Sequence, residues 1–330
     1  MNFDTSFVIS SLSPLHLAFK NSSYWEGYRE NEISHNTERF EFKKGWQTIY
    51  GRFVESPVVK VKLKDGFEGW GESNCGIGPE VVVTILDGII GQIVMGQEFQ
   101  HPKDLWNYLY DAQRGRGYSS GYWLDSMAAL DIAIWDAIGK REGLPVAAML
   151  SETPRTKIPV YLSGVRRNTL SERIQHLMKW VDQGLQGVKI FLDGDWQAGI
   201  EELSSLQNRV SNIKQWMVDT LWMCSSEQAE MSKLHYGEKN VKFLECPLQP
   251  EDLKGHRELS TKPGAPIALG EHFRTKYQLE PWLENPRIFD VYQPDLGRIG
   301  ISEFNEQMGM MSSHGIETTP HMGTGLSIFQ

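Results

Sequence analysis

The second half of the chain alternates short apolar runs with amphipathic segments. Each run is long enough for a β-strand, and intervening segments such as residues 170–181 and 301–311 carry apolar residues on one helical face. This alternation predicts a parallel sheet covered by helices. The predicted strands are residues 158–164, 187–193, 214–220, 241–247, 266–271, 289–295 and 316–322.

The first half follows a different pattern. Residues 56–63 alternate apolar and polar side chains, residues 64–66 read as a turn, and residues 67–72 resume an extended pattern. This arrangement predicts an antiparallel hairpin. A helix is predicted over residues 123–141, where apolar residues share one face, and Gly143 follows its end. Strands followed by helices are typical of an α+β domain.

The change of pattern places a domain boundary in the polar stretch of residues 151–157. We therefore expect an N-terminal α+β domain over residues 1–155 and a barrel domain over residues 156–330.

Six residues capable of chemistry occur at or near the C-terminal ends of the predicted strands, at intervals of 24 to 30 residues. In a parallel barrel the C-terminal ends of all strands open onto one face, so side chains far apart in sequence converge there. The six residues are Lys189, Asp219, Glu245, Glu271, Asp295 and His321.

The three acidic residues in the middle of this series, Asp219, Glu245 and Glu271, follow consecutive strands. A single acid at a strand end is more often a loop or helix-cap residue than a ligand. Three on successive strands favour a metal site, and hard oxygen ligands are those that Mg²⁺ prefers.

The remaining residues predict an acid-base site. Asp295 and His321 end neighbouring strands, and a carboxylate beside an imidazole fixes its tautomer and raises its basicity. A structural histidine with a nearby acid is the alternative, but His321 is in phase with the predicted metal ligands. Lys189, inside an apolar strand, can neutralise a substrate carboxylate. Together these groups suit removal of a proton next to a carboxylate and stabilisation of the resulting enediolate.

Composition narrows the class of protein. The chain has 42 acidic and 33 basic residues and a net charge of -9, which argues against a general nucleic-acid binder. Three scattered cysteines suit neither a disulfide framework nor a zinc knuckle, so a reducing cytoplasm is expected. No stretch predicts a membrane span or a secretion signal.

Several motifs occur in a fixed order along the chain. They are ALDIAIWDAIGKREGLPVAAML (residues 129–150), GVK at Gly187, VD at Val218, ECP at Glu245, GE at Gly270, QPDLGRIG (residues 293–300) and PHMGTG (residues 320–325). As a set they resemble the enolase superfamily and, within it, the mandelate racemase subgroup, also called the mandelate racemase/muconate lactonizing enzyme family.

The resemblance implies a capping α+β domain on a modified TIM barrel of the (β/α)₇β type. It also implies Mg²⁺ bound by Asp219, Glu245 and Glu271, and a dyad of His321 and Asp295. A loop of the capping domain should close over the substrate, and residues 20–32 are the expected segment. We further expect a homo-oligomer.

The chain departs from the family pattern in three places. The second lysine of a Lys-x-Lys motif is replaced by Phe191, and the asparagine of an Asp-x-Asn motif is replaced by Leu221. Only seven barrel strands are predicted, whereas such a barrel usually has eight. The C-terminal barrel strand is therefore expected to be missing from this chain, with the natural protein continuing beyond Gln330.

Loss of the second lysine leaves one base, His321. Racemisation usually needs an acid-base group on each face of the substrate, whereas one histidine can take an α-proton and then protonate a departing β-hydroxyl. The sequence therefore favours an acid-sugar dehydratase, a lyase acting on a small acid sugar or hydroxy acid. The alternatives are an epimerase or racemase, a lactone cycloisomerase acting through the same enolate, or a non-catalytic relative that binds a sugar acid or a partner protein.

Overall fold

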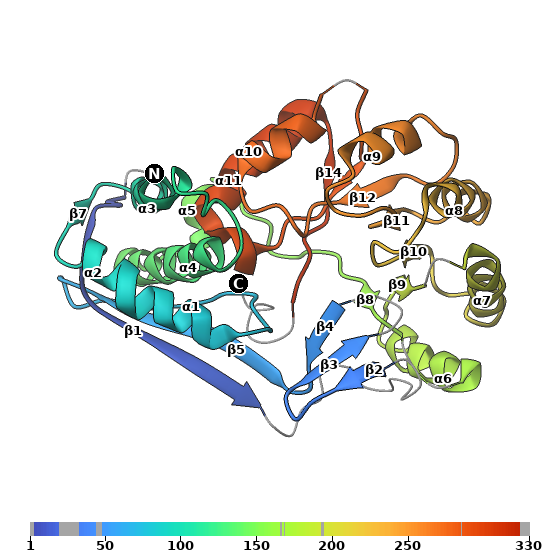
Figure 1. Ribbon diagram of the computed structural model, residues 1–330, viewed down its shortest axis with the longest axis horizontal. Coiled ribbons are helices and arrows are strands. Elements are labelled where there is room, and N and C mark those ends of the chain that lie inside the picture. The colour runs from blue at the N-terminus through green and yellow to red at the C-terminus, as the bar shows by residue number, and fades with distance from the viewer. Residues whose placement is uncertain are drawn as a thin grey trace.

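The computed structural model describes residues 3–19, 33–43, 48–165, 167, 169–192, 195–284 and 286–323. The described chain contains a four-stranded antiparallel sheet, a small three-stranded antiparallel sheet and a seven-stranded parallel sheet. In Figure 1 the four-stranded sheet and its helices lie on the left, and the parallel sheet with its helices lies on the right. We call the described residues up to Leu150, which form the two antiparallel sheets and their helices, the cap.

The predicted hairpin is present as strands β5 (Val54–Leu63) and β6 (Glu68–Glu72), paired antiparallel. Strand β1 (Phe7–Phe19), which the sequence pattern did not predict, pairs with β5 along its length. The sheet order is β6-β5-β1-β7. The other cap strands are β2 (Ile33–Asn36), β3 (Phe40–Lys43), β4 (Thr48–Gly51) and β7 (Glu98–Phe99).

The predicted helix of the cap is α4 (Tyr122–Glu142), and Gly143 ends it with a φ of 65°. A left-handed residue at this position is the common way to end a helix. Strand β6 packs closely on α4. The close approach requires glycine at positions 69 and 71, because a side chain at Gly69 or Gly71 would collide with the helix backbone. The remaining cap helices are α1 (Pro79–Ile85), the π-helix η2 (Leu86–Ile90), α2 (Gly91–Val94), α3 (Pro102–Arg114) and α5 (Val146–Leu150).

All seven predicted barrel strands are present, in the spatial order of the sequence. Within the described residues, β8 and β14 are the two edges of this curled sheet and do not pair with each other. Residues 20–32, the expected substrate loop, lie outside the described residues. The strands are β8 (Leu162–Ser163), β9 (Gly187–Phe191), β10 (Gln215–Asp219), β11 (Leu244–Glu245), β12 (Ile267–Leu269), β13 (Val291–Tyr292) and β14 (Glu317–Thr318).

The amphipathic segments between the strands form the covering helices, as predicted. Figure 1 shows α6 to α9 on the outer side of the sheet. None of the described helices combines the length and the apolar character needed to cross a membrane. The helices are α6 (Leu170–Val181), α7 (Trp196–Arg209), α8 (Ser226–Glu238), α9 (Leu253–Ser260), α10 (Lys276–Leu279), the 3₁₀ helix η3 (Glu280–Trp282) and α11 (Leu296–His314).

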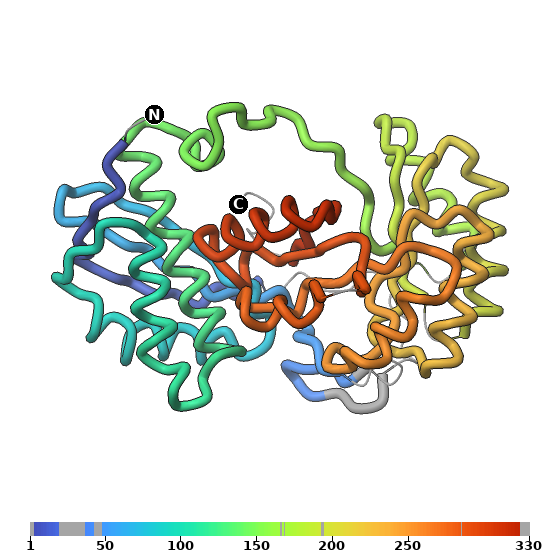
Figure 2. The backbone as a smooth tube through the Cα atoms, turned by 90° about the horizontal axis from the view of Figure 1, so that it is seen from above, coloured from blue at the N-terminus to red at the C-terminus, as the bar shows by residue number. Residues whose placement is uncertain are grey.

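The cap and the barrel meet where α11 packs against α4 (Figure 1). Figure 2 shows the green segment after α5 running along the molecule to the barrel strands. Partly buried ion pairs also join the two parts. Arg274 Nε lies 2.9 Å from Asp125 Oδ1 of α4, and Lys103 Nζ of α3 lies 2.8 Å from Glu303 Oε2 of α11. The barrel mouth is therefore held in a fixed relation to the cap.

Candidate active site

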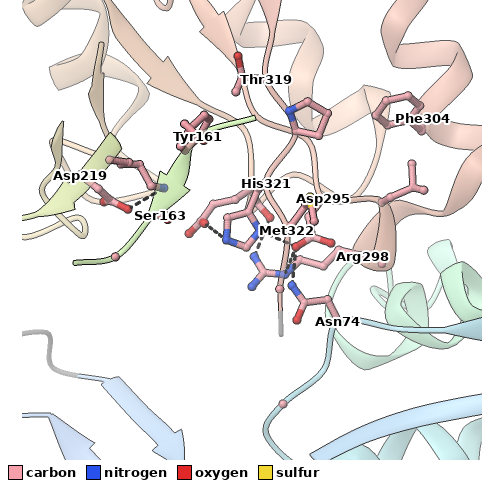
Figure 3. Close-up of a pocket in the computed structure, with 18 of the residues that line it drawn as sticks. Asn74, Tyr161, Ser163, Asp219, Asp295, Arg298, Phe304, Thr319, His321 and Met322 are labelled. Atoms are coloured by element: carbon pink, nitrogen blue, oxygen red, sulfur yellow. Dashed lines mark hydrogen bonds and ion pairs between the residues drawn. The ribbon is translucent and has the colours of Figure 1, made fainter. Parts of the chain in front are cut away.

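The structure brings the six predicted residues to the same end of the parallel sheet. Five of them line an open cavity of about 2120 Å³ that is bounded by the barrel mouth and cap residues, and the sixth, Glu245, lies buried beneath it. Figure 3 shows Asp219, Asp295 and His321 around this cavity. Parallel pairing explains the convergence, because the strands all end on this side.

Asp219 and Glu245 form a buried acidic pair. They are the last residues of β10 and β11 and occupy paired positions in the sheet, with 5% and 1% of their surfaces exposed. Burial and the neighbouring Glu245 raise the pKa of Asp219 to about 8. The ammonium of Lys189 lies 2.5 Å from Glu245 Oε1 and 3.2 Å from Asp219 Oδ2. This lysine therefore places one positive charge beside two carboxylates.

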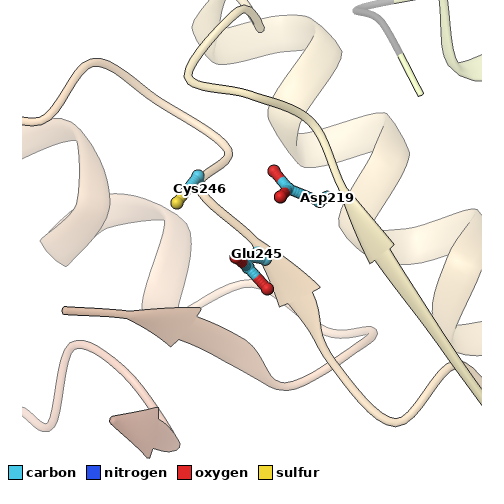
Figure 4. Close-up of side chains that lie close together, drawn as sticks. All are labelled: Asp219, Glu245 and Cys246. Carbon is cyan, nitrogen blue, oxygen red and sulfur yellow. The ribbon is translucent and has the colours of Figure 1, made fainter. Parts of the chain in front are cut away.

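These acids fit a divalent cation. Their oxygens, with the Cys246 sulfur, lie within 4.8 Å of one another (Figure 4). Burial and the neighbouring Glu245 both disfavour a negative charge on Asp219, and a bound cation would offset both effects. Glu271 lies outside this cluster of ligand atoms, two residues beyond β12. Its carboxylate accepts from the Trp222 indole at 3.3 Å instead.

His321 lies between two carboxylates. Its Nδ1 donates to Asp295 Oδ2 at 2.6 Å, and its Nε2 lies 2.9 Å from Glu271 Oε2. Burial opposes a charge on this imidazole, but Glu271 and Asp295 outweigh burial and raise the pKa of His321 to about 9. The predicted contact between His321 and Asp295 is therefore present. The second ring nitrogen of His321, Nε2, is paired with Glu271, a predicted metal ligand.

Other residues around the site had no predicted role. Gln293 Nε2 donates to Glu245 Oε2 at 2.6 Å, and Arg298 Nη1 donates to the Glu271 carbonyl at 2.7 Å. Both residues lie in the QPDLGRIG motif, so this motif is the sequence signal that could have identified them. Trp222 has a φ of 63° beside Leu221 at 56°. Two left-handed residues in succession are costly in backbone energy, and no local pattern marked them.

Phe191, at the position of the absent second lysine, lines the cavity. Its ring centre lies 5.4 Å from Lys189 Nζ, and the ring packs against Gly164, where an added Cβ would come within 2.7 Å. An apolar ring therefore stands at the cavity wall where a second titratable group would otherwise be.

Comparison with family models identifies the family of this chain. The sequence matches the mandelate racemase / muconate lactonizing enzyme N-terminal domain over residues 39–151 and the enolase C-terminal domain-like family over residues 172–329. The chain belongs to the mandelate racemase/muconate lactonizing enzyme family of the enolase superfamily.

The individual relatives described next share less than 30% sequence identity with this chain. The chain is 27% identical to L-talarate/galactarate dehydratase of Salmonella typhimurium, over 80% of this chain and 67% of the relative. It is 24% identical to D-galactarolactone cycloisomerase of Agrobacterium fabrum, over 82% of this chain and 72% of the relative. A solved structure of an enolase superfamily member from Agrobacterium tumefaciens, 28% identical, superposes with a TM-score of 0.90 over 98% of this chain and 83% of that chain.

Proposed function

We propose that the protein is a Mg²⁺-dependent acid-sugar dehydratase that converts a sugar acid to a 2-keto-3-deoxy acid. One observation carries this proposal. The imidazole of His321, oriented by Asp295, faces the cavity beside buried acids, while Phe191 lines the cavity at the position of the absent second lysine.

The metal would be held by Asp219, Glu245 and Glu271. Bound there, Mg²⁺ supplies positive charge next to the substrate carboxylate and so stabilises the negative charge that develops on it. The buried position of Asp219 and Glu245 supports the assignment for these two residues, because carboxylates kept out of water need compensating positive charge.

In the first step, Nε2 of His321 accepts the proton on the carbon next to the substrate carboxylate. The electron pair of the broken C–H bond moves into the carboxylate and gives an enediolate. Asp295 stabilises the imidazolium through Nδ1, and the ammonium of Lys189 offsets the added negative charge.

In the second step, the electron pair returns to form a carbon–carbon double bond as the β-hydroxyl leaves. His321 gives its proton to that hydroxyl, so one water molecule is released and the imidazole is regenerated. The enol product then becomes the 2-keto-3-deoxy acid. No oxidant or reductant is consumed.

Lactone cycloisomerisation is the second candidate, because a relative carries that name. It begins with the same proton abstraction but expels a ring oxygen in place of water. A non-catalytic role is less well supported, since the dyad and the acidic pair are both assembled.

Incubation with Mg²⁺ and a panel of acid sugars and their lactones separates these functions. The proposal expects a 2-keto acid and release of water from at least one open-chain acid sugar. Conversion of lactones alone would support the cycloisomerase instead. His321→Asn is the matched control, because it should retain substrate binding and lose both activities.

A further inference from the structure

Asn74 of the cap contacts the dyad from outside the barrel. Its amide Nδ2 donates to Asp295 Oδ2 at 2.5 Å, the same oxygen that accepts from His321 Nδ1 at 2.6 Å. Figure 3 shows Asn74 on a cap segment, with its side chain directed at Asp295. The two residues are 221 positions apart in the sequence, so this contact depends on how the cap docks.

The surroundings of Asn74 hold its side chain in this position. Its backbone N–H donates to the Gly297 carbonyl at 2.9 Å. A Cβ on Gly297 would lie 2.8 Å from that same nitrogen, and a Cβ on Gly323 would collide with the Asn74 amide. Two glycines of the barrel therefore provide the space that the asparagine occupies.

The contact limits rotation of the Asp295 carboxylate. Asp295 has 1% of its surface exposed, so little water is present to orient it. Besides His321 and Asn74, the guanidinium of Arg298 lies 3.6 Å from the same oxygen. With Oδ2 fixed by the amide, Nδ1 of His321 has one well-defined acceptor, and the ring plane and Nε2 are fixed in turn.

We infer that Asn74 is a positioning residue for the Asp295–His321 dyad, so that proton abstraction requires the cap to be docked on the barrel. This inference rests on the proposed function for its kinetic consequences. It assigns no contact between Asn74 and the substrate.

Asn74→Leu tests the inference, because leucine has a similar volume and no donor. Ser73→Ala is the matched control. Ser73 is fully buried in the same segment, and its hydroxyl has no hydrogen-bond partner among the described residues. We expect kcat for α-proton exchange to fall about 10- to 100-fold in Asn74→Leu, with KM within about twofold of wild type. Wild-type kcat, or a loss matched by Ser73→Ala, would overturn the inference.

A double-mutant cycle asks whether Asn74 acts through the dyad. In an Asp295→Asn background, Asn74→Leu should cause no further loss of the residual rate, because the carboxylate that it orients is gone. Independent, multiplying losses would overturn the inference. If Asn74→Leu does not fold, Gly323→Ala displaces the Asn74 amide without changing either residue and should lower kcat in the same way. Full activity of that variant would count against the inference.

A spectroscopic measurement separates this inference from the proposed function. In ¹H NMR, the proton between His321 Nδ1 and Asp295 should give a downfield signal that shifts or broadens in Asn74→Leu and not in Ser73→Ala. An unchanged signal would overturn the inference whatever the enzyme does. Absence of α-proton exchange in the wild type with every acid sugar would instead overturn the proposed function alone.

Discussion

The carboxylate of Glu271 lies 2.9 Å from Nε2 of His321, so a predicted metal ligand and the predicted base form one pair. Together with Asp295, Glu271 raises the pKa of His321 to about 9, against the effect of burial. In this arrangement the imidazole favours its protonated form at neutral pH, and the base becomes available when Glu271 is withdrawn from it.

The first prediction follows from this pairing. Mg²⁺ binding should release protons near neutral pH, because Asp219, with a pKa of about 8, and His321 both carry protons that a bound cation disfavours. Calorimetric titration in buffers with different ionisation enthalpies measures the release. A binding enthalpy that is independent of the buffer would contradict it.

The second prediction concerns the acidic pair. Glu245→Gln should weaken Mg²⁺ binding by at least about tenfold, because it removes a charged oxygen ligand from a buried site. Cys246→Ser is the control. Cys246 lies beside the acidic pair, but its sulfur is a softer donor than the oxygen ligands that Mg²⁺ prefers. Equal losses in the two variants would show that the metal site is placed elsewhere.

The third prediction concerns Phe191. With an apolar ring in place of a second base, proton transfer should occur on one face of the substrate only. Substrate recovered from a partial reaction in D₂O should carry deuterium without inversion, as observed by NMR and chiral chromatography. Recovery of the inverted epimer at a rate similar to product formation would point to a second acid-base group.

The seven barrel strands and the dyad could be predicted because their signals are local. Each strand is a short apolar run, and parallel pairing then places the strand ends together without further information. The hairpin and α4 were also marked by local patterns. Strand β1 was not, because Pro14 and interspersed polar residues obscure it, and its structure depends on pairing with β5.

The contacts made by the site residues could not be predicted in the same way. The sequence places Glu271 at a strand end, but its pairing with His321 depends on side-chain rotation in three dimensions. Asn74 lies in a cap segment with no periodic pattern, and its contact with Asp295 exists only when the domains dock. A single sequence contains no local pattern that predicts such contacts.

The fourth prediction concerns the junction of the cap and α11. Asp131 is buried and accepts from the Ser302 backbone at 2.8 Å and from its hydroxyl at 2.5 Å. Burial raises the pKa of Asp131 to about 6, despite these hydrogen bonds. The folded-state pKa of Asp131 lies above the ordinary value for an aspartate. The protonated carboxyl group therefore contributes fully to the free energy of unfolding below about pH 4, and this contribution is lost as the pH rises through about 6.

Asp131→Asn removes the titratable carboxyl group and keeps a side-chain oxygen that can accept a hydrogen bond from Ser302. The free energy of unfolding of the wild type, relative to this variant, should therefore fall by on the order of 3 kcal/mol between about pH 4 and pH 7.5. Urea denaturation of both proteins across this range measures the difference. A difference that does not change with pH would contradict the assigned titration.

The central claim is that His321 removes the proton next to a substrate carboxylate and that water then leaves. The most direct test follows acid sugars by ¹H NMR in D₂O with Mg²⁺, using the wild type and His321→Asn. The account predicts that the wild type converts one of them to a 2-keto-3-deoxy acid with loss of the α-proton signal, and that the variant binds it without exchange or product. Undiminished exchange in His321→Asn, or an epimer without keto acid from the wild type, would contradict it.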